Sequence, residues 1–332
     1  MRDVRFCDPV YGEIRFTENL LVDLYASQAV QRLRYVHQGG ITAFIKPERR
    51  TTRLDHSLGV AALLRILGAD VVEQAAGLVH DVAHTAFSHV VDFVFPNRDH
   101  VYHELHRERM LEASDLPDIL ARHGLDWRQV TDPEHFPLLE KPLPQLCADR
   151  LDYFLRDGVV DIGTFRMEDA QDLLSHLRIY DDRIIVDNVP TARWLGERFI
   201  ELDDVCWCSV QEVGWYAAMA EALRVALEHS IIAEDDFSGT DEDLLSRLRD
   251  ADDPAVNDRL SLLRREVDFV RSSDGDPNSD ALVALPKVRT IDPPVLVNGQ
   301  IARLSELDPE FRQRRQSYIG AKQGIWHLNI VI

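Results

Sequence analysis

Long apolar runs are absent from this 332-residue sequence. A membrane-spanning helix needs roughly 20 consecutive apolar residues, and no stretch here is long enough. The first residues, MRDVRFCDPVYGEIRF, also lack the apolar core of a secretory signal. We therefore expect a cytoplasmic protein that does not associate with membranes.

Cysteine is scarce as well. The sequence contains Cys7, Cys147, Cys206 and Cys208, whose spacing matches neither a disulfide framework nor a zinc knuckle. The last two are separated by one residue, whereas redox and zinc motifs have a two-residue gap. We expect the cysteines to be reduced and structural.

Positive charge is in short supply. The chain has 37 Lys and Arg against 57 Asp and Glu, a net charge of −20, and lysine occurs only at positions 46, 141, 287 and 322. Proteins that bind duplex nucleic acid gain much of their affinity by neutralising phosphates, so extended nucleic-acid binding is not expected. A phosphorylated small molecule stays compatible with this charge, because a metal and a few arginines act at short range.

Imidazole and carboxylate groups, by contrast, are concentrated in one apolar segment, residues 53–92. This segment carries His56, His80, Asp81, His84, His89 and Asp92. Polar groups that an apolar helix carries into the interior need partners there. A divalent metal takes imidazole and carboxylate ligands together and offsets the desolvation of a buried carboxylate. A lone histidine would more often be a hydrogen-bonded core residue, but the group as a whole favours a metal site.

The spacing predicts how these residues meet. Gly68-Ala69-Asp70 divides the segment into two helices, which we expect to pack antiparallel and to bring His56 close to His80. His84 follows His80 by one helical turn and is expected on the same helix face. Two or more imidazole ligands favour Mn, Fe, Zn, Co or Ni over Mg alone, although Mg could accompany substrate phosphates.

These motifs resemble those of a known family. His56, His80-Asp81 and a later Asp resemble the H…HD…D signature of the HD-domain phosphohydrolases. The phrases RLDHSLGV and HDVAHTAFSH resemble the deoxynucleoside triphosphate triphosphohydrolase branch. Residues 146–158, LCADRLDYFLRDG, resemble the DxxDYxxRD helix of that family. Its first Asp, here Asp149, completes a metal set of His56, His80, Asp81 and Asp149.

The resemblance also implies a mainly α fold, a helical bundle of the HD-domain type. We expect this domain over residues 1–233, with the metal core at about 50–160, and a small C-terminal α+β subdomain over residues 234–332. Within that tail, residues 244–250 and 259–271 are predicted to be helical, and Val297-Asn298-Gly299 predicts a hairpin. Apolar side chains at helical spacing over residues 205–227 predict a core-facing stripe.

Substrate-binding residues follow from the same resemblance. Gln38, in the phrase QRLRYVHQ, corresponds to a residue beside the nucleotide sugar. Arg53 matches a phosphate-contacting arginine, and its place one turn before His56 favours this role over the alternative of a surface salt bridge. Tyr153 and Asp157 match residues that hold deoxyribose, and Arg150 of the same helix is assigned to the substrate site. The implied partner is a nucleotide, and since the family is often oligomeric we also expect a homo-oligomer.

Acid–base roles are expected for the remaining polar residues of the segment. His84, supported by Asp92, would orient or deprotonate the attacking water, and His89 would contact the phosphate.

A second group of histidines follows that segment. His103 matches a general acid of the family, which protonates the leaving 5′-oxygen, and His106 remains an alternative. Recurrence every three residues from His100 to His106 could instead mark a second metal site or an exposed polar stripe.

The implied reaction is hydrolysis of a dNTP to a deoxynucleoside and triphosphate. Residues 203–220 depart from the family, because they contain no Arg, Lys or His where relatives place phosphate-binding cations. This departure keeps open a phosphohydrolase acting on a nucleoside monophosphate or a signalling nucleotide. A non-enzymatic nucleotide sensor is the second alternative, and the acid–base groups beside the metal set argue against it.

Overall fold

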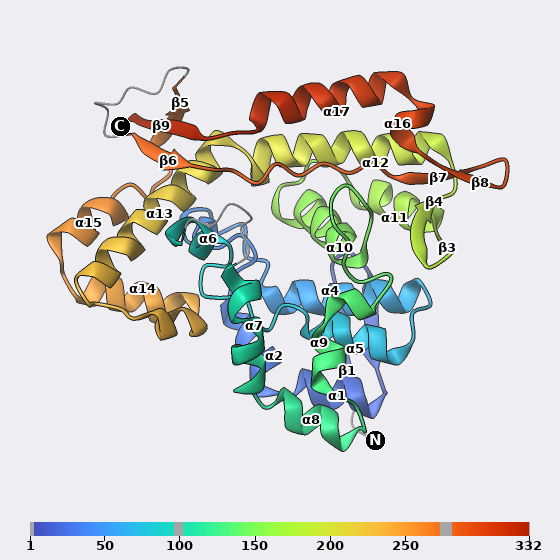
Figure 1. Cartoon of the computed structure of the whole chain (residues 1–332), viewed down its shortest axis with the longest axis horizontal. Coiled ribbons are helices and arrows are strands. Elements are labelled where there is room, and N and C mark those ends of the chain that lie inside the picture. Colours follow the sequence, from blue (N-terminus) through green and yellow to red (C-terminus); the bar gives the residue numbers. More distant parts are fainter. Residues whose placement is uncertain (1–2, 96–101, 273–280, 332) are drawn as a thin grey trace.

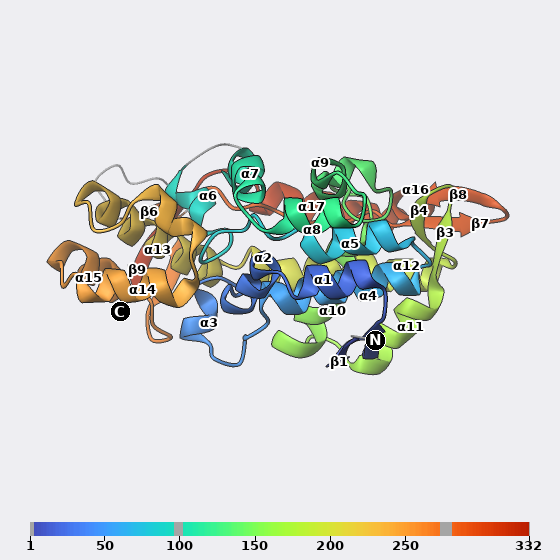
Figure 2. The same cartoon turned by 90° about the horizontal axis from the view of Figure 1, so that it is seen from below.

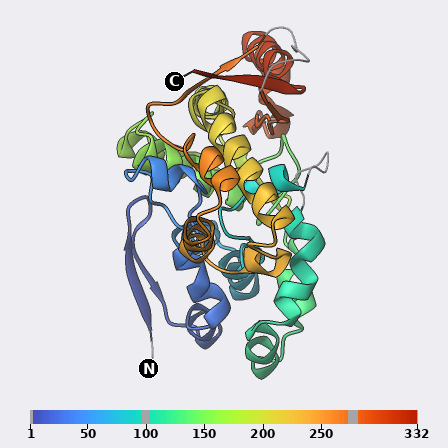
Figure 3. The same ribbon diagram turned by 90° about the vertical axis from the view of Figure 1, so that its left-hand side faces the viewer.

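The computed structural model describes residues 3–95, 102–272 and 281–331, and for residues 102–106 it describes the backbone alone. The described chain is mainly helical, as expected, with small sheets at its periphery (Figure 1). The first and last elements of the chain lie at opposite ends of the molecule (Figure 3). Among the described residues, no helix combines the length and apolar character that crossing a bilayer requires.

The centre of the fold is a pair of helices, α4 (Arg53–Ile66) and α5 (Val71–Val79), with α10 (Ala148–Arg156) packed on α4. Thr52 caps α4, and the Asp70 carboxylate caps α5 by accepting from the N–H groups of Val72 and Glu73, both at 2.9 Å. Gly68 adopts a φ of +84° between the two helices, a conformation that favours glycine. The predicted break at residues 68–70 is therefore confirmed.

The segment after α5 differs from the prediction. The helix ends at Val79, and residues 80–89 form turns, so His80 and His84 do not share a helix face. Tertiary contacts explain the difference. The Arg32 guanidinium donates to the carbonyls of Val82 and His84, at 2.8 and 2.6 Å. A continued helix would need these carbonyls as acceptors for its own backbone N–H groups.

The remaining helical elements surround this centre. They are α1 (Asn19–Tyr25), α2 (Gln28–Arg32), η1 (Leu33–Tyr35), α3 (Thr42–Ile45), α6 (Val90–Val94), α7 (Tyr102–Glu112), α8 (Leu116–Arg122), α9 (Trp127–Thr131), η2 (Pro133–His135), η3 (Asp157–Asp161), α11 (Met167–His176), α12 (Val189–Leu202), η4 (Asp203–Trp207), α13 (Val210–Glu228), η5 (Glu234–Ser238), α14 (Asp241–Asp250), α15 (Pro254–Leu260), α16 (Leu304–Leu307) and α17 (Pro309–Lys322). Helix α14 confirms the helix predicted over residues 244–250.

The strands form three sheets within the described residues. The N-terminal hairpin pairs β1 (Val4–Asp8) with β2 (Gly12–Phe16). A four-stranded sheet has the order β3 (Leu177–Tyr180), β4 (Arg183–Val186), β7 (Pro294–Val297) and β8 (Gln300–Arg303). A three-stranded sheet has the order β5 (Asp268–Arg271), β9 (Trp326–Val331) and β6 (Leu282–Ala284).

The C-terminal hairpin between β7 and β8 confirms the predicted turn, because Asn298 and Gly299 both have positive φ, 51° and 79°. This hairpin projects at the end of the molecule opposite to α14 and α15 (Figure 2). Its strand β7 pairs in parallel with β4, so the tail contributes strands to a sheet that begins before residue 234.

The helix predicted over residues 259–271 is wrong. Helix α15 ends at Leu260, and residues 268–271 form strand β5, which pairs with β9. Phe269 is buried against α13, where a Cβ on Gly214 would lie 2.2 Å from its ring. Burial of this ring and pairing with a strand about 60 residues later in the sequence override the local helical pattern.

Candidate metal centre and substrate pocket

Three elements bring the predicted metal ligands to one point. His56 lies near the start of α4, Asp149 near the start of α10, and His80 and Asp81 directly after α5. The Nε2 atoms of His56 and His80 are 3.2 Å apart, and Asp149 Oδ1 lies 3.0 Å from the first and 3.6 Å from the second. One potential ligand atom from each of His56, His80 and Asp81 lies within 4.8 Å of the others.

The outer contacts of both rings suit a cation at this point. His56 Nδ1 donates to Asp152 Oδ2 at 2.7 Å, and His80 Nδ1 donates to the carbonyl of Gly77 at 2.7 Å. With both Nδ1 atoms donating, the two Nε2 atoms face each other, and a cation between them would be held by both rings. The residues therefore fit a divalent metal.

Electrostatics favour the same ion. Burial lowers the pKa of His56, but hydrogen bonds to the carboxylates of Asp149 and Asp152 outweigh burial and raise that pKa to about 10. The field that attracts a proton to this ring also attracts a metal cation. Burial raises the pKa of Asp81, yet the neighbouring guanidinium of Arg53 and the imidazole of His80 hold it well below its usual range, so Asp81 is ionised and can be a ligand.

Arg53 lies inside the site and not in a surface salt bridge. Its Nη1 donates to Asp81 Oδ2 at 2.9 Å, and its Nε donates to Ser88 Oγ at 2.9 Å. The guanidinium is buried and lines the pocket, so a phosphate on the metal would lie within its reach.

The pairing of the acid–base residues differs from the expected one. His84 Nε2 lies 3.0 Å from Asp81 Oδ1, whereas the buried carboxylate of Asp92 accepts from His89 Nδ1 at 3.2 Å. The support from Asp92 thus goes to His89, because residues 80–89 form turns instead of the helix that our expectation assumed. Burial and the nearby Arg53 charge lower the pKa of His84 to about 3, which keeps this imidazole neutral near pH 7.

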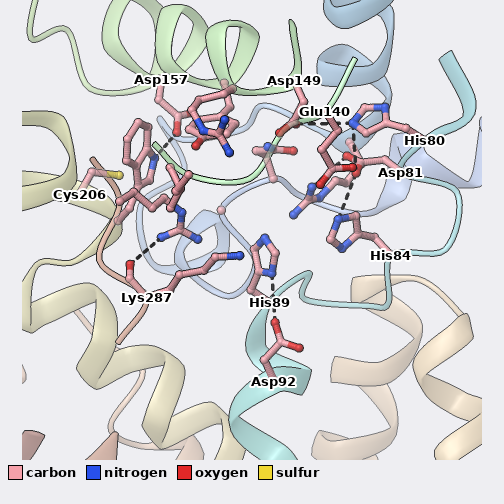
Figure 4. Close-up of a pocket in the computed structure, with 18 of the residues that line it drawn as sticks. His80, Asp81, His84, His89, Asp92, Glu140, Asp149, Asp157, Cys206 and Lys287 are labelled. Atoms are coloured by element: carbon pink, nitrogen blue, oxygen red, sulfur yellow. Dashed lines mark hydrogen bonds and ion pairs between the residues drawn. The ribbon is translucent and has the colours of Figure 1, made fainter. Parts of the chain in front are cut away.

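A cavity of about 630 Å³ opens beside the metal ligands. Figure 4 shows His80, Asp81, Asp149 and Glu140 grouped at one side of it, and Asp157, Cys206 and Lys287 at the other. The Lys and Arg residues that line the cavity are Arg49, Arg53, Arg107, Lys141, Arg150, Lys287 and Arg289. They come from four separate stretches of sequence, and none of them from residues 203–220.

The side of the cavity away from the metal ligands carries the residues assigned to the sugar. Tyr153 packs edge-on against Trp207 with ring centroids 5.0 Å apart, and Trp207 Nε1 donates to Asp157 Oδ2 at 2.6 Å. Gln38 lines the same cavity, and its buried Oε1 has no hydrogen-bond partner among the described residues. An unpartnered acceptor at a cavity wall is available to a ligand donor.

Arg150 has a different environment from the one predicted. Its terminal nitrogens donate to the carbonyls of Gln145 and Lys141, the latter at 3.0 Å, so the side chain ties the loop before α10 to that helix. Its buried Nε has no hydrogen-bond partner among the described residues. His103 lies in α7, but its side chain is outside the described residues.

Sequence reasoning missed several pocket residues. Glu140 projects toward the metal ligands in Figure 4, and burial together with the Asp149 carboxylate raises its pKa. Trp207 was expected in the core stripe but lines the pocket, while Lys287 and Arg289 arrive from the C-terminal tail. Only the rarity of lysine marks Lys287 in the sequence, and no local pattern marks the others.

Comparisons with known proteins agree with this geometry. A family model described as HD domain matches residues 53–157. The metal-dependent phosphohydrolase cns2 of Cordyceps militaris is 37% identical over 94% of this chain and 91% of its own length. The deoxynucleoside triphosphate triphosphohydrolase SAMHD1 of Gallus gallus is 33% identical over 38% of this chain and 19% of its own length. The solved structure of a phosphohydrolase from Bacteroides thetaiotaomicron shares the fold, with a TM-score of 0.69 at 18% identity over 98% of this chain and 99% of that one.

Proposed function

The chain belongs to the HD-domain metal-dependent phosphohydrolases, and we propose that it hydrolyses nucleotides, with a dNTP converted to deoxynucleoside and triphosphate as the first candidate reaction. The observation that carries this proposal is the cationic lining of the cavity. Residues 203–220 supply no cation, but the tertiary structure brings lysine and arginine to the cavity from other segments. A polyphosphate needs such compensation in a chain whose net charge is −20.

His56, His80, Asp81 and Asp149 would hold the metal, with Mn, Fe, Zn, Co or Ni fitting this mixed imidazole and carboxylate set. When bound, the metal would supply Lewis-acid polarisation of a phosphoryl oxygen and a lowered pKa for water.

The chain's own residues supply orientation and proton transfer. Arg53 binds a phosphoryl oxygen beside Asp81 and orients it for attack. His84, neutral near pH 7, orients the attacking water as a hydrogen-bond partner. His89, held by Asp92, donates to a phosphate oxygen. His103 donates the proton to the leaving 5′-oxygen.

The nucleoside occupies the far side of the cavity. Asp157 has one oxygen engaged by Trp207 and a second oxygen that can accept from the 3′-hydroxyl of the sugar. Gln38 Oε1 accepts from another donor of the nucleoside, and the Tyr153 ring packs against C2′. A ring in that place disfavours ribonucleotides, because the 2′-hydroxyl of ribose would have neither room nor a partner.

A nucleoside monophosphate or signalling nucleotide is the second candidate substrate. Two of the cavity cations are already engaged by carboxylates, since Arg53 pairs with Asp81 and Arg49 donates to Glu212. Fewer positive charges then remain for a polyphosphate, and this observation favours a substrate with a shorter phosphate chain.

Product analysis separates the candidates. Purified protein with Mn²⁺ is incubated with deoxy- and ribonucleoside mono-, di- and triphosphates, and the products are resolved by chromatography. Release of deoxynucleoside and intact triphosphate, abolished by Asp81→Ala, supports the first candidate. Conversion of monophosphates alone supports the second, and tight nucleotide binding without any turnover supports a sensor and contradicts the enzyme proposal.

A further inference from the structure

We propose that the N-terminal hairpin is part of the metal centre, with Asp8 acting through Arg156 and Asp152 as a positioning residue for the metal ligand His56. This inference rests on the metal site described above and adds the residues that connect His56 to the N-terminal hairpin. Asp8, Arg156, Asp152 and His56, which we call the buried network, are 4%, 2%, 0% and 0% exposed.

The contacts of the buried network are continuous. Asp8 Oδ2 accepts from Arg156 Nη2 at 2.9 Å. Arg156 in turn binds both oxygens of Asp152, through Nη2 at 3.0 Å and Nε at 3.1 Å. Asp152 Oδ2 accepts from His56 Nδ1 at 2.7 Å, which leaves Nε2 of that ring for the metal. A residue of the first strand is thus linked to a metal ligand through charged groups alone.

Charge balance makes each member depend on the next. Asp152 alone would leave an unpaired carboxylate in the interior, and Arg156 offsets it. Arg156 faces two carboxylates, so its own charge is shared between Asp8 and Asp152. Removing the Asp8 charge lets Arg156 interact more strongly with Asp152. Asp152 then becomes a weaker acceptor for His56, and Nε2 becomes a weaker donor to the metal.

Packing holds the buried network in one geometry. Helix α4 carries Gly59 where Arg156 and Asp152 approach it, and a Cβ at that position would lie 2.0 Å from Arg156 Nη2 and 2.1 Å from Asp152 Oδ1. The guanidinium and the carboxylate therefore have no room to move toward α4, so their distance to His56 is set by the helix packing.

Asp8 has two separable roles, which allows a selective variant. Its Oδ1 caps the hairpin turn by accepting from the N–H groups of Val10 and Tyr11, at 2.8 and 3.0 Å, while its Oδ2 faces Arg156. Asp8→Asn keeps one oxygen as an acceptor for the turn and removes the negative charge that interacts with Arg156. Asp8→Ala removes both.

The chain also offers a matched control. Arg178, Asp187 and His176 form an arrangement of the same composition, in which Asp187 accepts from His176 Nδ1 at 2.7 Å and lies 2.7 Å from Arg178 Nη2. None of the three lines the cavity. Arg178→Gln therefore removes the same kind of charge from a more exposed pair without reaching the metal ligands.

The test is a titration of each purified variant with Co²⁺ against a coloured chelator, with the visible spectrum of the Co²⁺-bound protein and a thermal melt recorded for each. Arg156→Gln removes the two hydrogen bonds that hold Asp152 in place, and we expect this loss of positioning to outweigh the gain in acceptor strength of Asp152 and to weaken Co²⁺ binding about 10- to 100-fold. Asp8→Asn leaves those two bonds in place and should weaken Co²⁺ binding by a smaller factor while shifting the spectrum. Arg178→Gln should bind as the wild type does. Arg156→Lys, which keeps the charge, should recover part of the lost affinity.

Wild-type Co²⁺ affinity and an unchanged spectrum in folded Asp8→Asn would overturn the inference, even if Arg156→Gln fails to fold. A purely structural role predicts a lower melting temperature with unchanged Co²⁺ binding, and that outcome also overturns it. The titration uses no nucleotide, so it is independent of the proposed substrate. Absence of Co²⁺ binding by the wild type would contradict the metal site itself.

Discussion

The Nε2 atoms of His56 and His80 lie 3.2 Å apart, although His56 lies near the start of α4 and His80 follows the end of α5, 24 positions later in sequence. Each ring donates from Nδ1 to a buried acceptor, so both lone pairs face the same point. The orientation of the two rings therefore suits a shared metal ion, and this assignment can be tested directly.

His80→Ala should abolish stoichiometric metal binding. Loss of an inner ligand costs more than the roughly 10- to 100-fold in affinity that outer-shell changes cost. Elemental analysis of protein dialysed after loading with Mn²⁺ should show near-zero metal for the variant. The control is His176→Ala, whose ring pairs with Asp187 outside the cavity and should retain wild-type metal. Equal metal content in both variants would contradict the assigned ligands.

Lys287→Ala should distinguish a polyphosphate substrate from a shorter one. If Lys287 binds a phosphate beyond the scissile one, its loss removes a charge-assisted hydrogen bond worth about 1.5–3 kcal/mol, or roughly 10- to 100-fold in kcat/KM for a dNTP. Turnover of a monophosphate should not change. Arg183→Ala, at an exposed position on β4, is the matched loss of charge. Equal losses of kcat/KM for the dNTP and the monophosphate would mean that Lys287 does not bind a phosphate beyond the scissile one.

Asp203→Asn should stabilise the protein in a pH-dependent way. Burial raises the pKa of Asp203 from 3.8 to about 6, although Arg289 and the Tyr318 hydroxyl partly oppose it. A raised carboxyl pKa means that the native state holds its proton more tightly than the unfolded state does, so stability falls as pH rises from about 4 to 6. Above pH 6 the cost is fully present, on the order of 2–3 kcal/mol.

Chemical denaturation at several pH values measures this difference. The Asn variant should be more stable than the wild type at pH 8, and the gain should vanish near pH 4. Asp204→Asn, which removes a half-exposed carboxylate beside Lys322, is the control and should show a much smaller change. A gain independent of pH would contradict ionisation as the cause.

Gly59→Ala should destabilise the protein by about 1–3 kcal/mol or prevent folding, because the added methyl group overlaps Arg156 and Asp152. Gly320→Ala is the counterpart in α17, where a Cβ meets nothing within 4 Å. That substitution should be neutral or stabilise by up to about 1 kcal/mol, since alanine is the better helix former. Thermal melts of both variants test this prediction. Similar destabilisation by both substitutions would mean that the overlap with Arg156 and Asp152 is not the cause at position 59.

Local sequence predicted those features that local chemistry decides. The break at residues 68–70 and the Asn298-Gly299 turn depend on residues a few positions apart, and the structure has both of them. The predicted metal ligands converge because helix length and the position of one break determine where the two ends meet.

Predictions that depended on distant partners were the ones that differed. Residues 80–89 leave the helix because Arg32, about 50 positions earlier, binds their carbonyls. Residues 268–271 become a strand because β9 pairs with them. The contacts of Arg150 with the preceding loop and of Asp92 with His89 likewise come from tertiary packing, which a helical wheel does not show.

By itself, then, the sequence determined that two helices separated by one break bring His56 close to His80 and Asp81, because helix geometry converts spacing into direction. Only the tertiary structure decided what surrounds these residues. It brought Lys287 and Arg289 to a cavity to which residues 203–220 contribute no cation, and it linked Asp8 to His56 through Arg156 and Asp152. Electrostatic and hydrogen-bonded partners act over a few ångströms of space, and the packing of segments far apart in sequence sets those distances.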